Sequence, residues 1–351
     1  MKGSQIGIIG GGIAAAVIIA VLFVSMGAQN DVAVPTVEPQ NDIAIEPEEK
    51  FLVYTTFYPL YQFTQGVAGD TAEVRILIPS NADPHASELG PQTIAALTKA
   101  DMVIYNGADF EPYIDEIMSA SDFAHVVFVD SSEGIELMEG EAHDHHGHGS
   151  HGDDKHDDHS KEDGHDDHGE EGVIDHTYDP HIWLDPILAK AQVMTIADHL
   201  QESDPAHAEI YHDNAISYAN QLDQLDQEIR SDVSSCAKDT FVPFHNAFSY
   251  FAERYDLNTL AVIQEFSPET PVTAKDIEEL IHFAEDNDIK YFFTEENRNP
   301  KLAERLAAEL GGDILLFSPL ESLSESDDPK VTYFEKMRQN VDNLQIALEC
   351  N

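Results

Sequence analysis

The stretch PAHAEIYHDNAISYANQLDQLDQEIRSDVSS, residues 205–235, decides the fold. Its apolar side chains recur every three or four residues, which is the spacing of one helix face. They are Tyr218, Leu222, Leu225, Ile229 and Val233. A helix over the whole stretch would be about 45 Å long at about 1.5 Å per residue, enough to run along two domains as a strut. A shorter helix packed on one domain is the alternative.

Short apolar runs alternate with helical stretches on both sides of this segment. The strands expected before it are 51–56, 74–78, 102–105 and 126–129, and those expected after it are 241–244, 260–263, 291–294 and 314–317. The helices expected between them are 91–100, 246–255, 274–286 and 300–310. This alternation predicts an α/β fold with two βα lobes, 50–204 and 236–351, joined by the helix 205–235.

The N-terminus predicts a membrane segment. No charged residue occurs from 3 to 30, and 6–24 is an almost continuous apolar run. That length can cross a bilayer, and it exceeds the apolar core of a usual signal peptide. We therefore expect residues 1–30 to be a retained anchor that places the rest outside the cytoplasm, with a cleaved signal and a secreted or periplasmic chain as the alternative. Residues 31–49, with three prolines, predict a disordered linker.

The charge of the chain limits its partners. Asp and Glu number 67 against 18 Lys and Arg, a net charge of −49. Such a surface repels nucleic acid phosphates and attracts cations, so no nucleic acid partner is expected. Cys236 and Cys350 are too few for a thiolate-rich zinc site. Outside the cytoplasm they either form a disulfide or remain two buried thiols.

Histidines and acids crowd into the segment 139–178. Nine histidines lie between residues 143 and 168, namely His143, His145, His146, His148, His151, His156, His159, His165 and His168. Imidazole and carboxylate at this density indicate metal capture by a flexible loop whose sites are weak. A solvated acidic loop without a specific role is the alternative.

Three further histidines stand where an α/β fold presents ligands. His85 follows the expected strand 74–78, His245 directly follows 241–244, and His181 lies just beyond the histidine-rich loop. Open α/β sheets bind ligands at the carboxyl ends of their strands, here in a cleft between the lobes. Each histidine alone is as readily a turn or cap residue.

Five short sequence motifs, in this order along the chain, resemble those of a known family. They are TFYPL at 56–60, ADPH at 82–85, DMVIYNG at 101–107, DPHIWLDP at 179–186 and FHNAFSYF at 244–251. From residue 50 onward the chain resembles the cluster A-I solute-binding receptors of ABC importers for zinc or manganese. The resemblance implies a monomeric binding protein rather than an enzyme, two lobes on a backbone helix, and a membrane permease and ATPase as partners.

The same resemblance implies that His85, His181 and His245 are the metal ligands. Glu321, the first carboxylate after the strand 314–317, is the candidate fourth ligand, with Glu295 or water as alternatives. Three imidazoles suit Zn²⁺ better than Mn²⁺, which prefers oxygen ligands, so Zn²⁺ is the expected ion. A receptor for manganese or another divalent metal, a zinc hydrolase and a metal-buffering surface protein remain the alternatives.

Several residues beside these ligands are expected to support the site. Asp83, Asp179 and Asp185 are candidates to orient histidine N–H groups, although the last two could instead cap the turns that follow them. Trp183 and Phe248 either back the cleft or belong to the ordinary core.

Overall fold

The computed structural model describes residues 50–140 and 177–350, except 80, 81, 83, 86, 265, 269–271 and 325. Residues from Glu49 onward form one compact unit. The expected anchor, the linker and the nine histidines of 143–168 therefore lie outside the described residues. Within the described ranges, no helix combines the length and apolar character needed to cross a bilayer.

The first lobe is built on a parallel sheet of four strands in the order β2-β1-β3-β4. The strands are β1 (Phe51–Thr55), β2 (Ala72–Ile76), β3 (Met102–Tyr105) and β4 (Val127–Asp130). Alternate residues of β1 and β3 face opposite sides, so Val53 and Met102 belong to one core cluster and Tyr54 and Val103 to another. Helix α1 (Tyr58–Ala68) packs in the first cluster, and α2 (Pro91–Leu97) and α3 (Ile114–Ser119) in the second. Helices on both faces explain why the inner strands β1 and β3 are nearly continuous apolar runs.

The second lobe repeats this topology. Its strands are β5 (Thr240–Phe241), β6 (Asn258–Thr259), β7 (Tyr291–Thr294) and β8 (Asp313–Leu316). β5 pairs with β6 and β7 with β8, both in parallel, and a parallel bridge between Val242 and Phe292 links the two pairs. The resulting order, β6-β5-β7-β8, matches that of the first lobe. Helices α7 (Ala274–Asp286) and α8 (Lys301–Leu310) supply the apolar cluster on one side.

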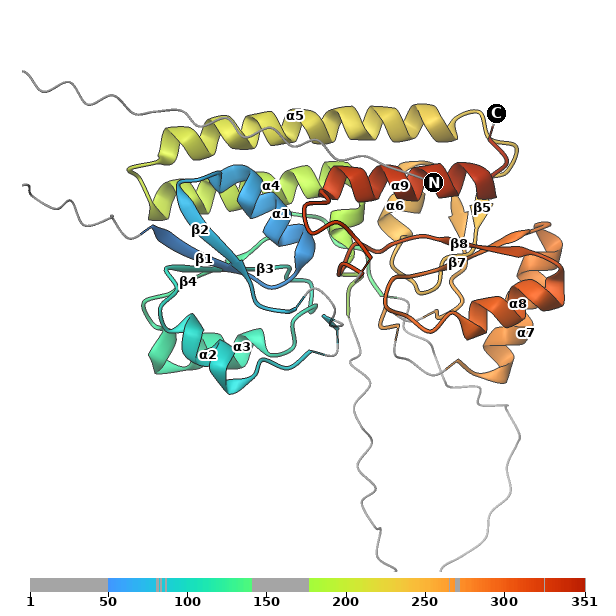
Figure 1. Cartoon of the computed structure of the whole chain (residues 1–351), viewed down its shortest axis with the longest axis horizontal. Coiled ribbons are helices and arrows are strands. Elements are labelled where there is room, and N and C mark those ends of the chain that lie inside the picture. Colours follow the sequence, from blue (N-terminus) through green and yellow to red (C-terminus); the bar gives the residue numbers. More distant parts are fainter. Residues whose placement is uncertain are drawn as a thin grey trace, which may run out of the picture. The chain divides into compact units, whose positions relative to one another are not determined.

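Helix α5 (Ala208–Val233) joins the lobes, as the sequence predicted (Figure 1). Its 26 residues span about 39 Å, and α4 (Pro186–Ser203) lies along it. Helix α1 of the first lobe and α9 (Tyr333–Ala347) of the second both pack on α5. Gly66 of α1 is needed for this approach, because a Cβ there would lie 2.4 Å from the Tyr218 ring. The fold is thus two α/β lobes held on one paired-helix spine.

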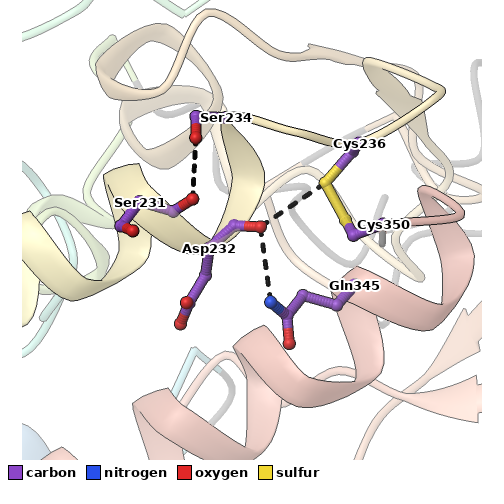
Figure 2. The surroundings of a disulfide bond; sticks show 6 residues. All are labelled: Ser231, Asp232, Ser234, Cys236, Gln345 and Cys350. Atoms are coloured by element: carbon purple, nitrogen blue, oxygen red, sulfur yellow. Dashed lines mark hydrogen bonds between the residues drawn. A yellow bond between two sulfur atoms is a disulfide. The ribbon is translucent and has the colours of Figure 1, made fainter.

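A disulfide lies at the C-terminal end of α5 (Figure 2). Cys236 follows α5 and Cys350 follows α9, and their sulfurs are bonded. Beside them, the Asp232 carbonyl accepts a hydrogen bond from Gln345 Nε2 at 3.3 Å. Of the two states that the sequence left open, the structure has the bonded one.

Candidate metal centre

Four side chains from loops converge between the lobes, and three of these loops follow strands. His85 follows β2, and His181 precedes the 3₁₀ turn Ile182–Leu184. His245 lies just after β5, and Glu321 lies between β8 and α9. The histidines are 0 to 2% exposed and Glu321 is 6% exposed. Chain direction explains the convergence, since parallel strands bring their carboxyl ends to the same edge of a sheet.

The nitrogens of the three rings surround a single carboxylate oxygen. Glu321 Oε1 lies 3.0 Å from His85 Nε2, 3.4 Å from His181 Nε2 and 3.3 Å from His245 Nε2. His181 Nε2 and His245 Nε2 are 3.3 Å apart. One ligand atom from each residue lies within 4.8 Å of all the others.

Four of the six distances between the ligand atoms match those around a tetrahedral ion, and the other two are no longer than 4.8 Å. Zinc bonds of about 2.0 to 2.1 Å place neighbouring tetrahedral ligands about 3.3 Å apart. The four distances just given are 3.0 to 3.4 Å. A closed set of four nitrogen and oxygen donors is typical of a zinc site that binds the ion tightly without a free coordination position for substrate water.

Buried carboxylates orient two of the rings from behind. Asp179 Oδ1 accepts two hydrogen bonds from His181, one from the ring Nδ1 at 2.8 Å and one from the backbone N–H at 2.9 Å. Glu295 Oε1 does the same for His245, at 2.6 Å from Nδ1 and 3.2 Å from the backbone nitrogen. A proton held on Nδ1 leaves the Nε2 lone pair free to bind a metal. Each lobe therefore contributes a histidine fixed by a carboxylate.

The same groups give the site a strong preference for positive charge. Burial by itself would lower the pKa of His245, but the charges and hydrogen bonds of Glu295 and Glu321 outweigh it and raise that pKa to about 10. Burial opposes ionisation of Glu321 too, yet the positive charge of His85 and hydrogen bonds from the rings hold its pKa well below the usual range. Two imidazole nitrogens that face each other at 3.3 Å need a proton or a cation between them.

The structure shows different roles for the supporting residues that were named from the sequence. Asp179 orients His181, whereas Asp185 caps α4 through Ile187 N and Leu188 N. Glu295, the runner-up ligand, contacts His245 from behind instead of joining the four-residue cluster. Asp83 lies outside the described residues. Trp183 and Phe248 are both fully buried, and the Trp183 ring lies 5.2 Å from the His181 ring.

Two supporting residues were not named from the sequence. Asn106 Nδ2 donates to the Pro180 carbonyl at 2.8 Å, and the Tyr250 hydroxyl donates to the Asp179 carbonyl at 2.9 Å. Together they hold the turn that carries His181. The sequence held one signal for Asn106, since this residue directly follows the strand at 102–105, in the same kind of position as the ligands.

Fold and site together define a two-lobed solute receptor with a buried site for one metal ion. The chain belongs to the ZnuA family, described as zinc-uptake complex component A, periplasmic, whose model matches residues 53–347.

Among its relatives, the high-affinity zinc uptake system protein ZnuA of Bacillus subtilis is 35% identical over 301 residues, which cover 86% of this chain and 88% of that protein. The zinc-binding protein AdcA of Streptococcus pyogenes is 33% identical, and the match spans 86% of this chain but 57% of AdcA. The Zn(II)-bound ZnuA-like domain of Streptococcus pneumoniae AdcA has a similar structure, with a TM-score of 0.67, 28% identity and coverage of 86% of this chain and 99% of that one.

Proposed function

We propose that this protein is an extracytoplasmic receptor that binds Zn²⁺ with high affinity and delivers it to an ABC-type membrane importer. The observation that carries the proposal is the spacing of His85, His181, His245 and Glu321, which suits one tetrahedral ion. The family and its zinc-binding relatives agree with this choice of ion. Three imidazoles and one carboxylate favour Zn²⁺ over Mn²⁺.

The proposal includes the way in which the chain is held outside the cell. Residues 1–30 would anchor it to the membrane, and residues 31–49 would act as a spacer for the lobes 50–204 and 236–351 on the helix 205–235. A zinc-binding lipoprotein of Streptococcus pneumoniae, AdcA, is among the relatives, which agrees with a membrane-held receptor. The partners would be a permease and an ATPase, and the receptor would act as a monomer.

Binding without catalysis is part of the proposal. A catalytic zinc site keeps a coordination position for water, whereas four protein donors fill a tetrahedron. Glu321 occupies the position that a reactive water would need, because its Oε1 is 3.0 to 3.4 Å from all three Nε2 atoms.

The test is competitive zinc titration of the purified protein against a chelator of known affinity, with Mn²⁺, Ni²⁺ and Cu²⁺ in parallel. The wild-type chain should have one tight site that selects Zn²⁺ over Mn²⁺. His85→Ala, His181→Ala, His245→Ala and Glu321→Ala should each weaken that site strongly, whereas His125→Ala, at an exposed histidine of the first lobe, should not. Unchanged tight binding in any one of the three ligand-histidine variants would overturn the proposed site.

A further inference from the structure

In its described residues, the segment that carries Glu321 has no helix or strand of its own. It runs from the end of β8 at Leu316 to the start of α9 at Tyr333. Leu320, directly before Glu321, has a φ of 60°, in the left-handed region that bulky residues rarely adopt. Neighbouring groups must therefore hold this turn in place.

Two side chains hold the backbone just before Glu321. Asn340 of α9 accepts from Ser318 N at 2.8 Å and donates to the Ser318 carbonyl at 2.6 Å. The Trp183 indole N–H donates to the Pro319 carbonyl at 2.7 Å. Asn340 belongs to the same lobe as Glu321, but Trp183 lies two residues after His181. The indole thus ties the segment of one ligand to the segment of another.

Trp183 is itself fixed on several sides. It is the single tryptophan of the chain and is 0% exposed. Its carbonyl accepts from the Tyr333 hydroxyl at 2.7 Å, and its ring packs edge-on against Phe57 at 4.6 Å and Phe110 at 5.2 Å between centroids. A ring held in this way has little freedom, so the position of its N–H determines where the Pro319 carbonyl lies.

We propose that Trp183 is a positioning residue that sets the distance between Glu321 and the three histidines. Its hydrogen bond to Pro319 draws the turn at Leu320 against the His181 turn, and this places the Glu321 carboxylate at the fourth corner of the site. The inference rests on the proposed function, because it concerns how the same site acquires its fourth ligand. Trp183 is not among the four residues whose ligand atoms meet there, and it acts through Glu321.

The experiment is a double-mutant cycle in the whole chain between Trp183→Phe and Glu321→Ala, read as zinc affinity. Phenylalanine keeps an aromatic ring but removes the N–H, which leaves the buried Pro319 carbonyl without this donor. Trp183→Phe alone should weaken zinc binding about 10-fold or more. In the Glu321→Ala background the same change should have almost no further effect, because the residue through which it acts is gone.

A matched control removes a similar hydrogen bond elsewhere in the segment. The Tyr58 hydroxyl donates to the Val331 carbonyl at 2.8 Å, so Tyr58→Phe deletes one link between the lobes ten residues beyond Glu321. This variant should keep wild-type affinity. Should Trp183→Phe fail to fold, judged by circular dichroism, Tyr333→Phe provides the second test, since it frees the Trp183 carbonyl and keeps the ring. Its smaller loss of affinity should likewise vanish in the Glu321→Ala background.

An equal loss of affinity in the presence and absence of Glu321 would overturn the inference, since Trp183 would then act on the fold or on His181. Wild-type affinity in Trp183→Phe would overturn it as well, while the proposed function would stand. A wild-type chain without a tight zinc site would overturn the proposed function, and the inference with it.

Discussion

At the scale of single residues, the site depends on paired groups that hold each other in one state. Asp179 and Glu295 bind their histidines through both the ring and the backbone N–H. A carboxylate in this position fixes the tautomer and strengthens the other ring nitrogen as a donor to the metal. The ligands therefore owe their affinity partly to residues that do not touch the ion.

Asp179→Asn and Glu295→Gln should each weaken zinc binding by about 10- to 100-fold without removing a ligand. The neutral amides are poorer acceptors and do not fix the tautomer. Zinc competition titrations measure the loss, and Glu73→Gln, at a half-exposed surface ion pair, is the matched control. Full affinity in both site variants would show that the carboxylates are structural only.

The pH dependence of zinc binding should extend above neutrality. An unperturbed imidazole pKa near 6.5 predicts that affinity changes only in acid. Here the pKa of His245 is raised to about 10 and that of His181 is raised too, in both cases against the effect of burial, by their carboxylate partners. The His245 ring therefore carries a proton at pH 7 that it must release to bind the metal, so a rise in pH removes a competitor.

The expected result is a zinc affinity that still increases between pH 7 and 8.5, by about tenfold per pH unit for each proton released. Calorimetry in two buffers with different heats of ionisation counts the protons directly. Glu321, whose pKa is held low, should release none in this range. A constant affinity above pH 7 together with no proton release would contradict the raised pKa values.

At the scale of elements, the spine decides how the two lobes meet. Helix α5 packs along α4 and receives α1 from one lobe and α9 from the other. Its buried face includes Tyr211, Ala215, Tyr218, Leu222, Leu225 and Ile229. Such continuous packing resists the wide hinge opening of two lobes joined only by loops.

Replacing both cysteines by serine should lower stability and spare the metal site. The disulfide between Cys236 and Cys350 closes a loop with a sequence separation of 114, so its loss should reduce the free energy of unfolding by about 2 to 4 kcal/mol. Urea denaturation measures this change. Zinc affinity should remain at the wild-type value. The bond joins the ends of α5 and α9, and none of the four site residues takes part in it. A variant with the free energy of unfolding of the wild type but a weaker zinc affinity would contradict this prediction.

At the scale of the whole molecule, two different kinds of metal binding are expected on one chain. The buried site is built from residues of both lobes, while the nine histidines of 143–168 lie outside the described residues. The high negative charge, −49, should attract cations to both.

Deletion of residues 141–171 should leave one tight zinc site and remove several weak ones. The chain enters and leaves this segment close together, since Glu139 pairs with Tyr178 as an isolated antiparallel bridge, so its removal should not pull the lobes apart. Zinc titration followed by calorimetry counts both classes of site. Loss of the tight site would show that the segment supplies a main ligand.

The sequence by itself determined the α/β class, the long helix between two lobes and the ion that three imidazoles prefer, because each follows from local periodicity or side-chain chemistry. The stripe from Tyr218 to Ile229 is visible without any tertiary information. The choice of Zn²⁺ over Mn²⁺ followed from the chemistry of imidazole, once the family resemblance had implied three histidines as ligands.

Only the tertiary structure decided which carboxylate joins the histidines. Glu295 and Glu321 both follow strands of the second lobe, and nothing local separates their roles. Glu295 lies on the Nδ1 side of His245. The Glu321 segment is held by Trp183 and Asn340, and its carboxylate faces the Nε2 atoms of the three rings. Distances between residues far apart in the chain depend on packing, and a sequence records packing only indirectly.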